Sequence, residues 1–403
     1  MLSSSCCSSF YFGRNISKIM YRGIATFTLD TGRCPPWLFE RMVRLGREMT
    51  RVLVEEYGPD VFIKRIADPV WFQSLGTVLA FDWNASGLTT ILTAALKEGI
   101  RGQERELGVF IAGGKGKTSR KTPDQIHEWG VRLSLTPEYV SNLQYNSRMA
   151  AKVDSALVQD GYQIYHHSFF FSRNGAWAVV QQGMNTYNQT ARRYHWFSEN
   201  VKDLVCEPHT GIASQVFGKR VLNLVSKDST QTRAVSTELV QGSYDTLLKD
   251  IQLLRKHYTS VSRTATFKKG EDVLKLAAFD GVEFKHHSVE LEDFSKSKYL
   301  EKILAKVSYE QPNTYEKLVA TEGVGPKTIR ALSLVAEIIY GAQPSYDDPA
   351  RYSFAHGGKD ATPYPVERET YDQTIDMLQK AVRRTRLSPA AKDKVLRRLN
   401  ARQ

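Results

Sequence analysis

Two apolar runs on either side of Asn174-Gly175 constrain the fold of this chain more than any other feature. The first run is QIYHHSFFFSR, residues 163–173, and the second is AWAVVQQ, residues 176–182. Both are rich in aromatic and β-branched residues, and Asn-Gly between two such runs is the strongest short-range signal for a β-hairpin. The sequence therefore predicts two antiparallel strands joined by a tight turn.

Polar residues of the predicted hairpin are expected to meet across its two strands. If the loop holds only the two residues Asn-Gly, positions whose numbers sum to 349 lie opposite each other. His167 then opposes Gln182, and Ser168 opposes Gln181, so polar groups gather in an otherwise aromatic hairpin.

Two carboxylates close to this hairpin suggest a metal site. Asp154 precedes it by a few residues, and Asp160 lies at the entry to the first strand, where a carboxylate can bind a hard cation. We interpret the segment as a metal-dependent phosphodiesterase, with Asp154 and Asp160 holding Mg²⁺ or Mn²⁺ and with Asp160, His166, His167 and Gln182 as catalytic residues. The alternative is that these side chains are surface or hydrogen-bonded strand residues.

Periodicity and composition outline the rest of the chain. An α/β or α+β N-terminal domain is expected, followed by an α-helical C-terminal part with a helix-hairpin-helix. The polar stretch 225–240 predicts a boundary. The predicted elements are a strand at 108–112 and helices at 38–57, 89–97, 243–257, 271–278, 298–308, 313–320, 328–340 and 367–385. The predicted regions are 1–19 (leader or mis-assigned start), 20–225 (candidate catalytic domain), 226–312 (helical connection), 313–386 (helix-hairpin-helix DNA-binding region) and 387–403 (basic tail).

Charge points to a polyanionic partner, and the lack of a long apolar run excludes an integral membrane protein. The 403 residues carry a formal net charge of +12, and residues 379–403 hold nine Lys or Arg against one Asp. No apolar run approaches the roughly 18 residues that a membrane span needs. Four cysteines without a CxxC pair indicate a reducing compartment.

The segment GVGPKT, residues 323–328, predicts contact with a nucleic-acid backbone. Helical periodicity precedes and follows it, as in the helix-hairpin-helix motif of DNA-repair proteins. Gly323 and Gly325 allow backbone N–H groups to approach a phosphate, while Lys327 and Thr328 open the second helix, whose N-terminus is the positive end of its dipole. Val324 is expected to anchor the turn in the core. The partner predicted is duplex, branched or damaged DNA, with RNA not excluded.

Two alternatives to a nuclease are kept open. Glycosylases with lyase activity place a Schiff-base lysine in a GVGxKT segment, where this chain has Lys327. Such enzymes also use an aspartate after the second helix, and Asp347 and Asp348 stand there without the usual Pro-Val-Asp context. The other alternative is a DNA- or RNA-binding protein without catalysis.

Other segments are candidates for nucleic-acid contact or chemistry. GGKGKTS, residues 113–119, places Lys115 and Lys117 in a glycine-rich loop that can cradle a phosphate but is not a Walker A sequence. QTARRYHW interleaves Arg192 and Arg193 with aromatic residues, a composition that suits single-stranded nucleic acid. The corner 81–87 and the loop 351–367 are further candidates for function.

The first 19 residues read as a leader or as the result of a mis-assigned start. They are rich in serine, contain Arg14 and Lys18, and contain no acid, which is the composition of an organellar transit peptide. Met20 begins a segment that reads as folded protein. The expected location is the cytoplasm or the nucleoid, or an organelle if the leader is genuine.

Several segments together resemble one protein family. The chain is similar to a prokaryotic, largely archaeal and thermophile family designated domain of unknown function 763. The resemblance spans about residues 20–380 and implies a nucleic-acid context without a particular activity. It rests on WLFERM, DPVWFQ, FDWNASGLTT, GGKGKTSRKTP, MAAKVDSALVQDGYQIYHH, WAVVQQGMN, ARRYHW, GVGPKTIRALSLVAEIIYG and RYSFAHGGKDATPYPV.

Overall fold

The computed structural model describes residues 21–22, 27–29, 34–79, 85–258, 266–269, 272–275, 298–350, 352–353 and 368–400. The predicted leader, the acid and the amide of the 81–87 corner, and all but two residues of the 351–367 loop lie outside the described residues. Within these residues, no helix is long and apolar enough to cross a membrane.

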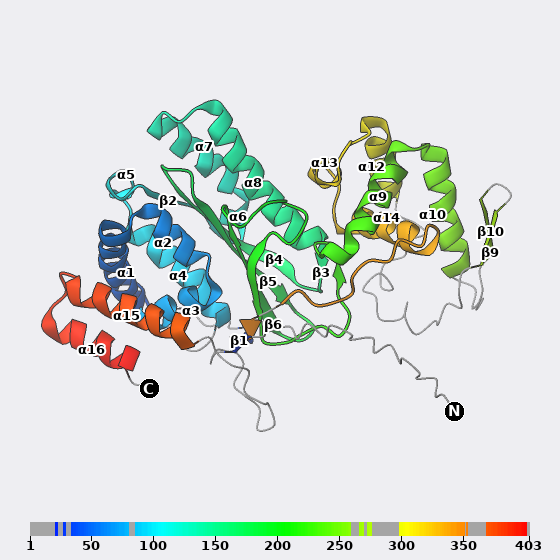
Figure 1. The fold of residues 1–403 in the computed structure, drawn as a ribbon. Coiled ribbons are helices and arrows are strands. Elements are labelled where there is room, and N and C mark those ends of the chain that lie inside the picture. The colour runs from blue at the N-terminus through cyan, green and yellow to red at the C-terminus, as the bar shows by residue number, and fades with distance from the viewer. Residues whose placement is uncertain are drawn as a thin grey trace, which may run out of the picture.

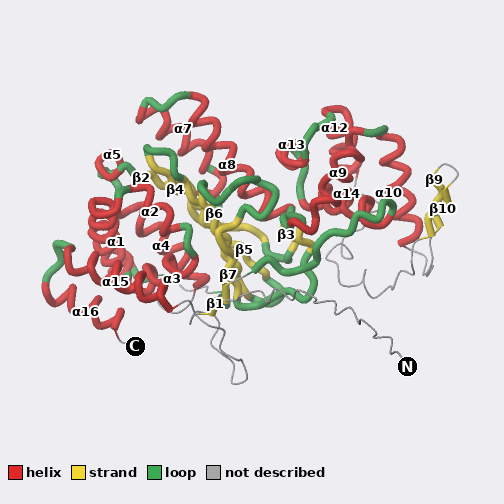
Figure 2. The backbone as a smooth tube through the Cα atoms, viewed as in Figure 1, coloured by secondary structure: helices red, strands yellow, loops and turns green. Residues whose placement is uncertain are grey.

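A seven-stranded sheet forms the centre of the molecule, with helices on both of its faces (Figures 1 and 2). Its strand order is β1-β11-β7-β6-β5-β4-β2, and the five strands from β7 to β2 are antiparallel. The mixed fold predicted for the N-terminal region is therefore confirmed. The strands are β1 Tyr21–Arg22, β2 Val109–Lys115, β4 Gln163–Ser172, β5 Trp177–Asn185, β6 Thr190–Phe197, β7 His209–Ser214 and β11 Tyr352–Ser353.

The predicted hairpin is β4–β5, but its register differs from the prediction by one residue. His166 pairs with Gln182, and His167 pairs with Gln181. The predicted pairing was wrong because the Ser172 N–H donates to the Ala176 carbonyl at 2.9 Å, and the loop that this hydrogen bond closes holds three residues, 173–175, rather than two. The Ser172 hydroxyl accepts three backbone N–H groups of the turn, each at 3.2 Å, and thereby stabilises the longer loop.

Helices from the two ends of the chain cover one face of the sheet (Figure 1). Their apolar side chains share one core with the sheet, in which Trp71 and Leu92 join Phe170 of β4 and Leu378 near the C-terminus. The helices predicted at 38–57, 89–97 and 367–385 are confirmed. This layer holds α1 Pro36–Tyr57, α2 Pro59–Ile66, α3 Pro69–Val78, α4 Ala85–Gly99, α5 Glu104–Leu107, α15 Arg368–Arg384 and α16 Pro389–Asn400.

The opposite face is covered by α7 and α8, and α8 connects the sheet to the C-terminal helices. One core cluster contains Phe169 of the sheet, Val153 of α8, and Leu318 and Ile329 of the C-terminal helices. The C-terminal part is helical, as predicted. The elements here are α6 Lys117–Arg120, α7 Thr122–Leu133, α8 Pro137–Ala156, β3 Val158–Gln159, β8 Leu222–Asn223, the 3₁₀ turn Lys227–Ser229, α9 Thr230–Gln241, α10 Tyr244–Tyr258, α12 Lys298–Glu310, α13 Tyr315–Ala320 and α14 Pro326–Ile338.

The polar stretch 225–240 contains α9, which buries polar side chains in hydrogen bonds, such as Thr232 Oγ1 to Ala342 O at 2.8 Å and Arg233 Nη1 to Leu224 O at 2.7 Å. The boundary expected there stays a prediction, but one prediction of local structure was wrong. The helix predicted at 271–278 is instead part of an antiparallel pair, β9 Thr266–Lys269 with β10 Asp272–Lys275. Short runs of this kind do not distinguish a helix from a strand by periodicity.

Candidate functional site

The sheet separates the polar residues that the sequence assigns to a single site. Neighbouring residues of a strand point to opposite faces. His166 and Gln182 therefore face α4, and His167 and Gln181 face α8, as their hydrogen bonds confirm. The expectation that His166 and His167 act together is corrected by this alternation.

The first group, which we call the α4-face cluster, consists of Ser86, Thr93, Tyr165, His166 and Gln182. A β-bulge between Ile164 and His166 turns Tyr165 to the same face as its neighbour. The Gln182 amide nitrogen donates to the Ser86 carbonyl at 2.8 Å and to the Tyr165 hydroxyl at 2.5 Å. Since both donor positions are used, its carbonyl Oε1 is the remaining polar atom, and it is buried and has no hydrogen-bond partner among the described residues.

His166 presents a second buried atom without a partner. The Thr93 and Ser168 hydroxyls each lie 3.1 Å from His166 Nε2. If Nε2 carries the ring proton, the lone pair is on Nδ1, which is buried and has no hydrogen-bond partner among the described residues. Burial, together with the positive charge of Lys115, lowers the pKa of His166 to about 3, so the ring is neutral at physiological pH.

Lys115 connects this cluster to the glycine-rich loop. It pairs with His166 across β2 and β4, and its ammonium group lies 5.9 Å from the centre of the Tyr165 ring. Both Lys115 and Lys117 are exposed, as a phosphate-contacting role requires. The structure thus brings together three predicted site residues, Lys115, His166 and Gln182.

The base of the loop is fixed by close packing. Gly113 has φ +87°, and a Cβ at this position would lie 2.2 Å from the His167 carbonyl oxygen. Lys97 Nζ donates to the Gly113 carbonyl at 2.9 Å and to Gln125 Oε1 at 2.7 Å. Burial lowers the pKa of Lys97.

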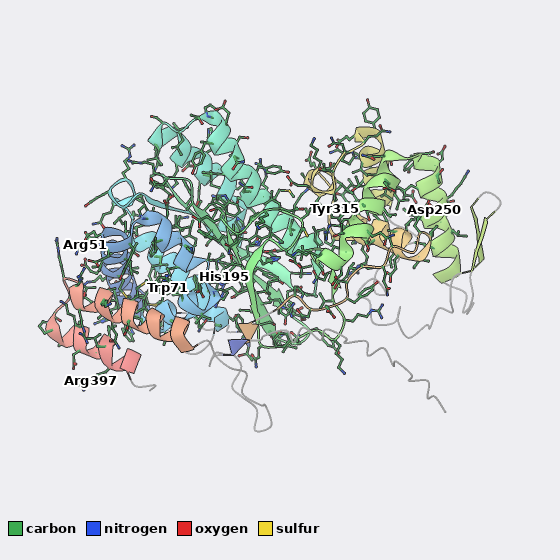
Figure 3. All side chains as sticks on the ribbon, in the orientation of Figure 1. Arg51, Trp71, His195, Asp250, Tyr315 and Arg397 are labelled. Carbon is green, nitrogen blue, oxygen red and sulfur yellow. The ribbon has the colours of Figure 1, made fainter. Side chains whose placement is uncertain are left out.

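Arg193 also lies on the α4 side of the sheet but does not reach the surface. Its side chain is fully buried, and it donates to His195 Nε2 at 2.8 Å, to Gln73 at 3.2 Å and to Thr89 at 3.3 Å. Burial lowers the pKa of Arg193 to about 9. Figure 3 shows His195 between the helices and the sheet, so this part of β6 is core rather than an exposed basic surface.

The second group, which we call the α8-face network, is a chain of hydrogen bonds. It consists of Ser147, Asp154, His167, Gln181 and His209. Gln181 Nε2 donates to Asp154, so its Oε1 accepts from His167 Nδ1 at 2.9 Å, and His167 Nε2 accepts from Ser147 at 2.9 Å. Asp154 also accepts from His209 Nε2 at 2.5 Å. Asp154 is fully buried and surrounded by protein donors.

Asp160 belongs to a buried ion-pair network instead of facing solvent. Arg192 donates to Asp160 at 2.8 Å and, through two nitrogens, to Asp348 at 3.0 and 2.8 Å. Tyr194 donates to Asp160 at 2.7 Å. Burial alone would lower the pKa of Arg192, but the carboxylates of Asp160 and Asp348 raise it above its ordinary value. Arg192 is 1% exposed, so it is a structural cation in this conformation.

The predicted metal ligands are therefore occupied by contacts within the protein. In the part of the chain that the structure describes, no group of three or more His, Cys, Asp or Glu residues could hold a metal ion. Asp154 and Asp160 accept hydrogen bonds from different donor sets. A role for Mg²⁺ or Mn²⁺ stays a prediction.

The turn at residues 321–325 joins α13 to α14 and has one buried and one open side. Val324 is 5% exposed, as expected for a core anchor. Gly323 has φ +90°, and a Cβ there would lie 2.4 Å from Ile303. Gly325 has no neighbouring atom within 4 Å of such a Cβ. In the first turn of α14, Lys327 is exposed, whereas Thr328 is buried and its hydroxyl is not presented to a ligand.

Side chains of α8 and β3 hold this turn in place. Lys152 Nζ donates to the carbonyl oxygens of Val319, Ala320 and Thr321 at 2.9, 3.1 and 2.6 Å. A lysine in this position satisfies the carbonyl groups at the C-terminus of α13 and interacts favourably with its dipole. Gln159 Nε2 donates to the Pro326 carbonyl at 3.1 Å.

Sequence reasoning missed the residues that complete these sites. Lys152, Thr93 and Lys97 lie on helices without any local motif. Tyr165 was missed because regular alternation places it on the opposite face from His166, and only the bulge reverses this. His209 is held by Asp154, a contact across the fold that spacing does not indicate.

Comparison with known proteins places this fold in a family. Over residues 23–366 the chain matches the family described as "Protein of unknown function (DUF763)", and it belongs to that family. No curated protein matches the chain. No solved structure matches it either.

Proposed function

We propose that this protein binds DNA through the turn at 321–325 and the N-terminus of α14. The observation that carries the proposal is the two-sided geometry of the turn. Val324 is buried, whereas Gly325 faces open space. No side chain caps α14 at Gly325, so the dipole of this 13-residue helix is directed towards that open space.

A phosphate is the ligand that suits this geometry. The first N–H groups of a helix have no partner within the helix and favour an anion, and the exposed Lys327 adds a full positive charge. The net charge of +12 favours a polyanion over an isolated anion. Contacts of this kind position a protein on the backbone without reading the base sequence.

The test is binding of a fluorescently labelled DNA duplex, measured by anisotropy at several salt concentrations. We expect affinity that depends weakly on sequence and that falls steeply with salt. Lys327→Glu should weaken binding at least tenfold, while Lys317→Glu, a matched change at an exposed lysine of α13, should have a smaller effect. Equal effects of the two substitutions would contradict the proposed contact.

A second candidate function is hydrolysis of the bound phosphodiester at the α4-face cluster. The observation in its favour is the pair of buried atoms without partners, His166 Nδ1 and Gln182 Oε1, next to the cation of Lys115. Buried polar groups are nearly always hydrogen-bonded. We infer that these two atoms complete their bonds with a ligand or water, because they lie on side chains that face the same side of the sheet beside an exposed lysine. In the tautomer that carries its proton on Nε2, His166 would accept a hydrogen bond from the attacking water through Nδ1 and so orient it.

Cleavage of end-labelled DNA with Mg²⁺, with Mn²⁺ and with EDTA tests this candidate. Hydrolysis at the cluster predicts product that is lost in His166→Gln, with DNA binding retained. The lyase alternative predicts instead that borohydride traps an adduct on abasic DNA, insensitive to EDTA and lost in Lys327→Ala. Intact DNA under all conditions would leave a binding protein without catalysis.

A further inference from the structure

We propose that one exposed face of α12 continues the DNA-binding surface and selects nucleic acid with unpaired bases. This face, which we call the α12 stripe, consists of Tyr299, Lys302, Lys306 and Tyr309. Its tyrosines would stack on bases, and its lysines would contact phosphates. The inference rests on the proposed function, because it adds a substrate class to the same binding surface.

The α12 stripe is a consequence of helical spacing. Its members are separated by three, four and three residues, which places them on one side of the helix. The other side of α12 is apolar and buried in the core. The residues that face the core are Leu300, Ile303, Leu304 and Val307.

The two tyrosines are exposed to an extent that the fold does not require. Tyr309 is 91% exposed and Tyr299 is 62% exposed, whereas Tyr315 of the neighbouring helix α13 is 8% exposed. Aromatic side chains that alternate with cations on a surface suit single-stranded nucleic acid, since a base can stack on each ring while the cations follow the backbone.

The α12 stripe lies directly beside the turn at 321–325. The Tyr299 hydroxyl is 3.5 Å from the position that a Cβ of Gly323 would occupy. Lys306 Nζ donates to the Glu322 carbonyl at 3.1 Å. A strand whose phosphate is held at the turn is therefore adjacent to Tyr299 and Lys306, and from there the α12 stripe extends along the helix to Tyr309.

The charges around the α12 stripe favour nucleic acid with unpaired bases over a rigid duplex. Lys306 also lies 3.8 Å from a carboxylate oxygen of Glu310 and 3.7 Å from one of Glu322, so part of its charge is neutralised. Lys302, one turn earlier on α12, is exposed. With one lysine partly neutralised, stacking supplies a larger share of the binding free energy, and stacking requires bases that are not already paired.

The experiment compares binding of a single strand of about 16 nucleotides, a blunt duplex and the same single strand as RNA. Tyr309→Ala should weaken binding of the single strand about tenfold and leave duplex binding within a factor of two. Tyr309→Trp should restore single-strand affinity, because an indole ring also stacks. The control is Tyr187→Ala, which removes a 97% exposed tyrosine from the β5–β6 turn and should change nothing.

Three outcomes separate the two proposals. Loss of single-strand binding alone in Tyr309→Ala, with rescue by Tyr309→Trp, supports the inference. Comparison of the RNA strand with the DNA strand then shows which of the two the α12 stripe prefers. Unchanged single-strand binding in Tyr309→Ala, with binding still sensitive to Lys327→Glu, overturns the inference and leaves the proposed function intact. Absence of binding to every nucleic acid overturns both.

Discussion

Many polar residues in the core of this protein are stabilised by specific partners, and the buried atoms that have none among the described residues include two in the α4-face cluster. Asp154, Asp160 and Arg192 look like catalytic or binding residues in the sequence, yet each is buried among protein donors or acceptors. Residue type alone does not distinguish these roles, because the same carboxylate can bind a metal or an arginine. The unpartnered atoms of His166 and Gln182 make the α4-face cluster a better candidate for ligand contact than these three residues.

Buried histidines make stability dependent on pH. Burial lowers the pKa of His166, His167 and His195 below the usual value near 6.5, which the unfolded chain retains. Between the two values the unfolded state binds more protons, so stability is fully present above pH 6.5 and is lost as the pH falls. We expect urea unfolding to show this loss, with a slope up to about 1.4 kcal/mol per pH unit for each such histidine.

His166→Gln identifies the contribution of one of these groups. This variant should have a shallower decline of unfolding free energy between pH 6.5 and 4 than the wild-type protein. His127→Gln, at an exposed histidine of α7, should have the wild-type slope. A wild-type slope in both variants would contradict the account of His166.

Asp160→Asn tests whether the carboxylate is structural. The change leaves Arg192 with one acidic partner, Asp348, in a buried site, and we expect it to lower the free energy of unfolding by about 2 kcal/mol. Glu128→Gln on the surface should cost less than 0.5 kcal/mol. Unchanged stability in Asp160→Asn would show that the ion pair contributes little.

At the scale of elements, the sequence predicts the features that residues close together in the chain determine. The hairpin, most helices and the buried Val324 follow from periodicity and turn residues. The register of β4 and β5 does not follow from these signals. One extra residue in the loop shifts β5 by one position along β4, so every β5 side chain lies on the opposite face from the one predicted relative to β4. The candidate site could not be predicted without the register, because the register places His166 opposite Gln182. The attachment of α13 to α8 is likewise a tertiary contact without a sequence signal.

Lys152→Met tests how that attachment supports the turn. Removing the ammonium group takes one donor from each of three carbonyl groups at the C-terminus of α13, of which that of Thr321 keeps the Val324 N–H. We expect a loss of about 1–2 kcal/mol in unfolding free energy and faster amide exchange in residues 315–325. DNA affinity should also fall, because the turn is no longer held in one conformation. Lys317→Met, at an exposed lysine of α13, is the matched control.

At the scale of the whole molecule, the basic C-terminal tail and the helices around the turn at 321–325 lie towards opposite ends (Figure 3). Figure 3 shows Arg397 of α16 and Tyr315 of α13 towards opposite ends, with the sheet between them. The C-terminal tail holds much of the net positive charge, and α15 packs its apolar residues against the α1–α4 layer. A sufficiently long duplex could therefore contact both the tail and the turn.

Lys394→Glu on α16 tests the second contact. We expect weaker binding of a duplex of about 40 base pairs and a salt dependence reduced by about one phosphate contact. A duplex of about 10 base pairs, roughly 34 Å long, should bind Lys394→Glu as it binds the wild-type protein, because it engages the turn alone. Equal losses with both lengths would contradict two separate contacts.

The most direct test of the DNA-binding proposal is to compare Gly325→Asp with Gly325→Asn. Both side chains fit the open space at this position and both are favourable N-caps, so neither should lower the urea midpoint. Only aspartate places a negative charge where the phosphate is expected. The account predicts that Gly325→Asp binds duplex DNA at least tenfold more weakly than Gly325→Asn. Equal, wild-type affinity in both variants would show that DNA does not bind at this turn.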